Sequence, residues 1–234
     1  MKTTIITLLL MMSCLCTQAQ VKAIKPHEIH PMPKIGYQEY ERLFQLSQKD
    51  NPTPAEKKLL EGFEEDPIYT DLYSGYCSWY CGGEILSVKA SSCLKPYKKF
   101  TYKGKNAHDF NHESVWAEGA PGQGTGEYLV YEFPGKCPRI TNVKILNGHV
   151  KSNKAWKENS RVKKLKMYYM DKPYAILELE DSRSLQCFDV GVLGPHNPEA
   201  PNWTMKFEIM EVYPGSKYED TVISELYFDG IDVH

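Results

Sequence analysis

Residues 203–209 alternate strictly between large apolar and polar side chains, in the run WTMKFEI. Successive side chains of a β-strand point to opposite faces, so this pattern predicts a strand with one buried face. We therefore expect Trp203 to lie in a hydrophobic core.

Six further segments have the length and the Val, Ile, Tyr and Phe content of strands. They are residues 127–133, 140–146, 162–169, 174–179, 184–190 and 222–228. Turn pairs such as Pro134-Gly135 and Asn147-Gly148 separate several of them, and no helix-length amphipathic stretch interrupts the series. Strands without crossover helices pair antiparallel, and seven of them need two packed faces. The sequence thus predicts an all-β fold, an antiparallel β-sandwich or jelly roll.

The stretch 20–70 differs, because it is polar, rich in proline and carries two short helix-like patterns. The first, residues 37–48, places apolar side chains on one face. The second begins at Thr53, a good N-cap residue, followed by Pro54, which fits the first helical turn. We expect a small N-terminal helical appendage that acts as a linker or spacer.

The N-terminus has the features of a secretory signal peptide over residues 1–19. An apolar stretch of about ten residues leads to the small-x-small site Thr17-Gln18-Ala19, and it is too short to span a bilayer. A lipid-attachment site at Cys14 is a less favoured alternative. These features predict a secreted, periplasmic or cell-surface protein with no transmembrane segment, whose main domain covers residues 71–234.

The charge of the chain indicates which partners it can bind, and its cysteine content bears on whether the thiols are oxidised. The net charge is −2, with 28 basic and 30 acidic residues interspersed, so the chain lacks the basic footprint of a nucleic-acid binder. Signal removal leaves five cysteines, which are Cys77, Cys81, Cys93, Cys137 and Cys187. In an exported chain we favour disulfides of unknown pairing over a zinc site at the first three.

The loop around residues 108–112 carries two candidate metal chemistries. His108 and His112 mimic the spacing of a zinc-hydrolase signature, but that signature requires a helix, and glycine and proline flank this segment. Asp109 and Asn111 offer oxygen ligands of the kind that calcium prefers. Ordinary side-chain-to-backbone turns at these two residues are the alternative.

A tryptophan in the polar loop 151–159 suggests a sugar platform. Sugars stack their C–H faces on aromatic rings, and their hydroxyls pair with Asn and Arg side chains, so Trp156 and its neighbours suit a saccharide. A ring folded back onto the sandwich is the alternative.

The glycines of the run 122–126 have the wrong spacing for a dinucleotide fingerprint, and no Gly-x-Ser-x-Gly elbow is present.

The chain from about residue 76 onward resembles the NADase-type glycan-binding domain, a discoidin-like member of the galactose-binding-like jelly rolls. Any one matching piece is weak, but their order and spacing together are fairly specific. The pieces are 77–83 (CSWYCGG), 90–92 (ASS), 106–109 (NAHD), 116–119 (WAEG), 122–127 (GQGTGE), 147–148 (NG), 159–163 (NSRVK), 213–215 (YPG) and 223–226 (ISEL).

The resemblance implies glycan recognition without catalysis. It also implies a structural calcium ion held by Asp109, Asn111 and Glu225, with Glu118 and Glu127 tying loop backbone to the sandwich. Two departures stand out: Phe110 occupies a position where such loops commonly have glycine, and Ser114 one where they have threonine.

We therefore expect an exported carbohydrate-binding module that recognises glycans through loops at one end of the sandwich. Its predicted glycan-binding residues are Asn153, Trp156, Asn159 and Arg161. The alternatives are a protein- or peptide-interaction domain of the cell envelope, and a zinc hydrolase that uses the two histidines of residues 108–112.

Overall fold

The structure is a computed structural model that describes residues 21–64, 68 and 78–233. The predicted signal peptide, the alternative lipid site at Cys14, and Cys77 lie outside the described residues. Within the described part of the chain, no helix is long and apolar enough to cross a bilayer.

Every predicted strand is present, which confirms the all-β fold. The seven strands are β5 (Tyr128–Phe133), β6 (Arg139–Asn147), β7 (Ser160–Tyr169), β8 (Lys172–Glu178), β9 (Ser184–Leu193), β10 (Trp203–Tyr213) and β11 (Thr221–Ile231). Burial in β10 alternates from Trp203 to Ile209, as the sequence pattern requires. Between residues 78 and 127, sequence reasoning missed the short strands β3 (Ser87–Ala90) and β4 (Trp116–Ala117), and the 3-10 helices η1 (Trp79–Cys81) and η2 (Gly104–His108).

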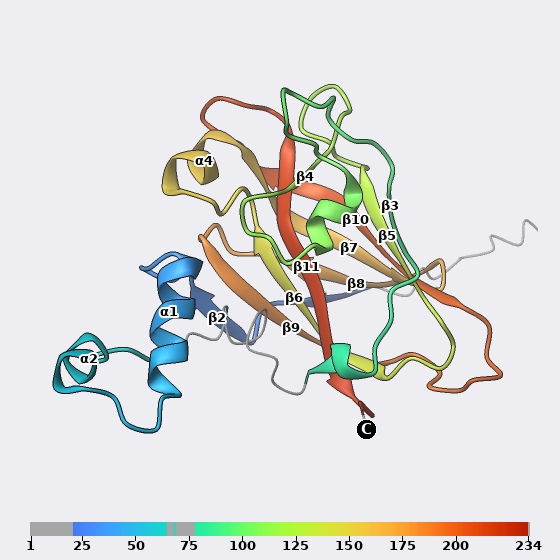
Figure 1. The fold of residues 1–234 in the computed structure, drawn as a ribbon. Helices are drawn as coiled ribbons and strands as arrows, with labels where there is room; N and C mark the ends of the chain where they lie inside the picture. The colour runs from blue at the N-terminus through green and yellow to red at the C-terminus, as the bar shows by residue number, and fades with distance from the viewer. Residues whose placement is uncertain (1–20, 65–67, 69–77, 234) are drawn as a thin grey trace, which may run out of the picture.

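Hydrogen bonds link the strands into a single sheet, and the short pairing of β11 with β7 divides this sheet into two layers (Figure 1). One layer contains β9, β6, β11 and β4, and the other contains β8, β7, β10, β5 and β3. Most pairs are antiparallel, but β11 joins β7 in a short parallel pairing, Thr221 with Ser160 and Val222 with Arg161. The expectation of purely antiparallel pairing was therefore wrong for this pair, where two strands of different layers meet only briefly.

Aromatic side chains fill the space between the layers. Phe228 of β11 lies with its ring centroid 5.1 Å from that of Tyr131 and 5.2 Å from that of Phe133, both on β5. Because β11 does not pair with β5, these contacts cross the sandwich. Trp203 is 2% exposed and stacks on Phe133, which confirms its predicted place in the core. Full burial of a phenylalanine side chain such as that of Phe133 contributes roughly 1.5–3 kcal/mol.

The N-terminal stretch contains strands as well as the expected helices. The helices are α1 (Tyr37–Ser47) and α2 (Pro54–Leu59), and Thr53 closes a capping box with Glu56. In addition, β1 (Lys22–Ile24) pairs in parallel with β8, and β2 (Glu28–Pro31) pairs antiparallel with β9. The segment is therefore more than a helical spacer, because it extends one edge of each layer. These strands are too short and too exposed to show an alternating pattern.

A second hydrophobic cluster lies apart from the main core. It contains Ile68, Leu146, Val150, Leu185, Cys187 and Tyr227, with Met32 and Trp156 packed against it. Leu146 and Leu185 are paired across β6 and β9, so the cluster covers part of that sheet. Figure 1 shows α1 and α2 beside the same layer. Apolar contacts thus attach residues N-terminal to the sandwich to it.

Candidate functional site

The predicted saccharide loop is a short helix in the structure. Helix α4 (Asn153–Glu158) begins after Ser152, whose hydroxyl accepts a hydrogen bond from the Ala155 N–H at 3.1 Å. The sequence interpretation as a loop was therefore wrong here. A single turn of helix with a serine cap is too short to show helical periodicity.

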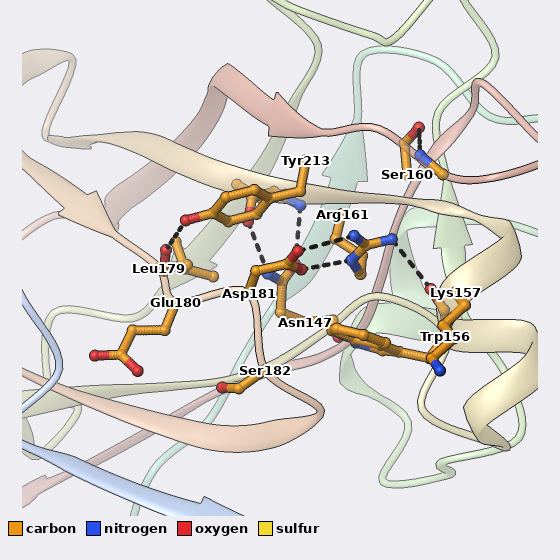
Figure 2. Close-up of polar contacts among 12 residues, drawn as sticks. Asn147, Trp156, Lys157, Ser160, Arg161, Leu179, Glu180, Asp181, Ser182 and Tyr213 are labelled. Carbon is orange, nitrogen blue, oxygen red and sulfur yellow. Dashed lines mark hydrogen bonds and ion pairs between the residues drawn. The ribbon is translucent and has the colours of Figure 1, made fainter.

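Arg161 lies at the start of β7, just after this helix, and its guanidinium donates all of its hydrogen bonds described here to protein atoms (Figure 2). Its Nε and Nη2 donate to the two carboxylate oxygens of Asp181 at 2.7 and 3.1 Å. Its Nη1 donates to the carbonyl oxygens of Asn159 at 2.9 Å and Trp156 at 3.3 Å. Only 6% of Arg161 is exposed. Its guanidinium holds together a cluster of Trp156, Asn159, Arg161 and Asp181, which we call the corner.

Trp156 is turned inward against Arg161. The guanidinium carbon lies 4.4 Å from the centre of the indole ring, and the indole N–H donates to the Asn147 carbonyl at 3.0 Å. Gly148 makes this stacking possible. A Cβ at that position would lie 2.7 Å from Cγ of Arg161 and 2.9 Å from Cδ1 of Trp156, and its φ of +79° also favours glycine.

The structure thus brings together three of the four predicted glycan residues, but in internal contacts. The Asn159 side chain donates to the Ala155 carbonyl at 2.8 Å, where it fastens the end of α4. Asn153, at the start of α4, is the exposed member of the set.

Asn153 lines a groove of about 660 Å³ between the N-terminal segment and the sandwich. One wall consists of Met32, Pro33, Lys34, Ile35, Gly36 and Gln38. The other consists of Asn111, His112, Glu113, Val150, Lys151, Asn153 and Arg183. Sequence reasoning missed most of these residues, because only the fold brings together segments that lie so far apart in the chain.

Charges of both signs face this groove. Lys151 forms an ion pair with Glu113, with 3.1 Å between Nζ and Oε2. Arg183 donates through Nε to the Val150 carbonyl at 2.9 Å. Burial, together with the Arg183 charge, lowers the pKa of His112 to about 4, so this imidazole is neutral at neutral pH. The groove therefore offers amides, cations, a carboxylate and a neutral ring.

A pair of carboxylates lies beneath the loop that carries Asn111. Both Asp109 and Glu225 accept a hydrogen bond from the Asn111 backbone N–H, at 3.1 and 2.8 Å. Burial and the neighbouring Asp109 carboxylate raise the pKa of Glu225 well above its ordinary value. Oxygen Oε2 of Glu225 is buried and accepts no hydrogen bond within the described structure.

These carboxylates fit a hard cation that prefers oxygen ligands. The Ser114 hydroxyl lies 2.8 Å from each carboxylate oxygen of Asp109 and adds another oxygen to the cluster. The Asn111 side chain is arranged differently, since its amide oxygen accepts from the Glu113 N–H at 3.1 Å and closes a turn. The three predicted metal residues therefore meet, with Asn111 contributing to the shape of the loop.

The two histidines of the hydrolase alternative do not share a helix. Helix η2 ends at His108, and His112 lies in the loop that follows. His108 is packed among aromatic rings, and its Nδ1 lies 2.8 Å from the Leu226 carbonyl oxygen. The geometry that the zinc-hydrolase signature requires is therefore missing from this segment.

Glu118 and Glu127 hold loops against the sandwich, the role that the family resemblance implied for them. Glu118 is fully buried and accepts hydrogen bonds from the backbone N–H groups of Thr221 at 3.1 Å and Ala120 at 2.8 Å. A Cβ on Gly124 would lie 2.4 Å from the Glu118 side chain. Glu127 accepts hydrogen bonds from two serine hydroxyls, those of Ser91 and Ser92. The carboxylates of Glu118 and Glu127 therefore hold loops against the sandwich.

The cysteine prediction finds no support among the described residues. Cys81, Cys93 and Cys137 are free thiols in the structure. Cys137 is buried, and its Sγ lies 3.2 Å from the Glu84 carbonyl oxygen and 3.3 Å from the Glu84 backbone nitrogen.

Comparison with protein families identifies the family to which the sandwich domain belongs. The family model of the NAD glycohydrolase translocation F5/8 type C domain matches residues 79–229, which is more than half of the chain. The chain belongs to this family. The result confirms the predicted discoidin-like, galactose-binding-like fold. A comparison with curated proteins gives no match.

Solved structures with a similar fold to this F5/8 type C domain include carbohydrate-binding modules of Clostridium perfringens. The CBM32-1 and CBM32-2 domains of ZmpB give a TM-score of 0.48 at 13% identity, over 72% of this chain and 40% of that one. CpGH89CBM32-5, in complex with GalNAc-β-1,3-galactose, gives 0.45 at 14% identity, over 63% and 100%. The family 32 module of NanJ, in complex with galactose, gives 0.41 at 15%, over 61% and 91%.

The match to the F5/8 type C family divides the groove between two parts of the chain. Residues 111–113, 150–153 and 183 lie inside the matched region, whereas residues 32–38 precede it. The N-terminal segment thus adds a wall to a face of the family domain.

Proposed function

We propose that this protein is an exported, non-catalytic carbohydrate-binding module. The groove that contains Asn153 carries the proposal. Its volume of about 660 Å³ falls in the range of small-ligand sites, roughly 300–1,000 Å³. The resemblance of the chain to glycan-binding domains supports the same function.

The lining of the groove suits the mixed chemistry of a sugar. The side-chain amides of Asn153 and Gln38 each offer donors and an acceptor, which match the dual nature of a hydroxyl group. Met32 and Ile35 supply apolar surface for the C–H face of a ring. A strongly charged ligand would meet both signs in the ion pair formed by Glu113 and Lys151.

Trp156, Asn159 and Arg161 have a supporting role in this proposal. The hydrogen bonds described above all go from these side chains to protein atoms, and they fasten α4 at its middle and at its end. Asn153 begins the same helix. We therefore assign the three residues to positioning, and Asn153 to contact with the ligand.

Calcium is the second component of the proposal. Asp109 and Glu225 would hold the ion, and the Ser114 hydroxyl lies close enough to take part. When bound, the ion supplies positive charge that balances two neighbouring carboxylates. Because Asn111 and Glu113 belong to the same loop and line the groove, calcium would order one wall of the site.

The test is a glycan array probed with residues 20–234, in calcium and in a chelator. We expect a specific set of glycans to retain the protein, and expect Asn153→Ala and Gln38→Ala to reduce that retention. Lys172→Ala, on β8 away from the groove, serves as the control. An empty array, together with a pull-down that returns one envelope protein, would favour the protein-interaction alternative.

Export has a separate test. The signal sequence predicts that the mature N-terminus lies just after Ala19. Mass spectrometry of the protein recovered outside the cytoplasm checks this position. An intact Met1 or a lipid-modified Cys14 would contradict it.

A further inference from the structure

Three side chains with different metal-binding chemistry meet where the N-terminal segment joins the sandwich. A carboxylate oxygen of Glu28, a ring nitrogen of His30 and the sulfur of Cys187 all lie within 4.8 Å of one another. His30 Nε2 lies 3.2 Å from Glu28 Oε2. This cluster is separate from the groove and from the Asp109 and Glu225 pair.

The strand register produces the cluster. Glu28 on β2 lies directly opposite Cys187 on β9, and His30 lies opposite Leu185. Directly opposed residues share a face of a sheet, and residues two apart on one strand share it as well. All three side chains therefore project from the same face.

The donor set selects a class of metal. Calcium and magnesium take oxygen ligands, so a thiolate and an imidazole argue against them. Zinc accepts sulfur, nitrogen and carboxylate oxygen together, in tetrahedral sites whose ligand atoms lie about 3.5 Å apart. We propose that Glu28, His30 and Cys187 form a site for Zn²⁺ or a similar divalent transition metal, with one coordination position left for water.

Access and charge are compatible with this site. Cys187 is 3% exposed, whereas the side chains of His30 and Glu28 are 30% and 59% exposed, so a metal can enter from the solvent side. Lys144 lies opposite Cys187 on the next strand, β6, but its ammonium pairs with Asp229 at 3.0 Å. That pairing offsets the positive charge of Lys144.

The metal would link the edge strand β2 to β9. Two ligands come from the N-terminal segment and one from the sandwich, so binding stabilises their pairing. The Cys187 thiol releases its proton to solvent on binding, because the thiolate is the ligand. Residues 32–38, which follow β2 and form one wall of the groove, would be held in place as a result.

The test is a titration of the mature chain, free of any affinity tag and kept reduced, with Co²⁺ and then Zn²⁺. We expect one Co²⁺ per chain with a thiolate-to-cobalt charge-transfer band, and displacement by Zn²⁺. Cys187→Ser should abolish the band. His30→Gln should weaken binding by more than the roughly 10- to 100-fold typical of outer-shell changes.

Two control variants separate this site from adventitious binding. His27→Gln removes an imidazole just before β2, and Cys137→Ser removes a buried thiol elsewhere, so both should bind as the parent does. If Cys187→Ser fails to fold, His30, whose side chain is only partly buried, still provides the test. Absence of a stoichiometric site, a cobalt complex without the thiolate band, or unchanged affinity in His30→Gln would overturn the proposal.

Discussion

Two neighbouring regions of this molecule contain similar residues and differ in where their hydrogen bonds go. In the corner, the Arg161 and Asn159 side chains donate to protein oxygens, and the Arg161 guanidinium covers the Trp156 ring. In the groove that Asn153 of α4 lines, amide and charged side chains surround a cavity of about 660 Å³.

The difference teaches that residue type does not distinguish a binding surface from a structural corner. Tryptophan, arginine and asparagine are the side chains that recognise sugars, and they are also the ones that fasten loops. What separates the two roles is whether each donor already has a partner inside the protein, which only coordinates reveal.

The largest expected effect is on the structural side of this comparison. Arg161→Ala leaves the Asp181 carboxylate and two carbonyl oxygens without their donor, and should lower the free energy of unfolding by about 3 kcal/mol. This is the low end for a buried pair, because the Asp181 side chain is 39% exposed and can rehydrate. Chemical denaturation measures the loss.

Arg42→Ala is the matched control for that substitution. Arg42 also pairs with a carboxylate, that of Glu39, but on an exposed face of α1. Its removal should leave the free energy of unfolding close to that of the parent, because solvent screens an exposed ion pair. Equal losses in the two variants would show that the corner is no more structural than an ordinary surface ion pair.

The second effect concerns calcium and the wall of the groove. Saturating calcium, at about 100 times its dissociation constant, should stabilise the parent by about 2.7 kcal/mol. Glu225→Gln should lose this response. In a chelator the same variant should be more stable than the parent, because its amide can donate to the adjacent Asp109 carboxylate.

Thermal unfolding of both proteins, with calcium and with chelator, gives the four values needed. Asp229→Asn, a nearby acid on the same strand that pairs with Lys144, controls for a general effect of lost charge. A parent protein indifferent to calcium would remove the ion from the proposal and leave the groove standing.

A smaller effect is expected from Trp156→Phe. A smaller aromatic ring remains beside the Arg161 guanidinium, but the Asn147 carbonyl oxygen loses the hydrogen bond of 3.0 Å that the indole N–H donates. One unmade hydrogen bond should cost about 1 kcal/mol of unfolding free energy. Glycan retention should stay close to that of the parent, measured on the same array. A large loss of retention with unchanged stability would instead place Trp156 in contact with sugar.

The sequence predicted the sandwich well, because alternation along strands such as 203–209 is a local consequence of one buried face. It missed β2, whose short, exposed strand is defined by pairing with β9. It predicted the meeting of Asp109, Asn111 and Glu225 only through the family resemblance. The groove could not be predicted, since its walls lie far apart in the chain and the positions of Gln38 and Asn153 depend on the docked N-terminal segment.

The smallest expected effect on stability, and the sharpest test of the comparison, is Asn153→Ala. Asn153 is exposed at the first position of α4, and Ser152 provides the helix cap, so the unfolding free energy should change by less than about 0.5 kcal/mol. Retention on the glycan should nevertheless fall about tenfold, which corresponds to about 1.4 kcal/mol for lost hydrogen bonds to the ligand. Trp156→Phe should give the reverse pattern, with lower stability and retained binding. If both variants lose binding in proportion to stability, the distinction between the corner and the groove fails, and the glycan contacts must lie elsewhere on the sandwich.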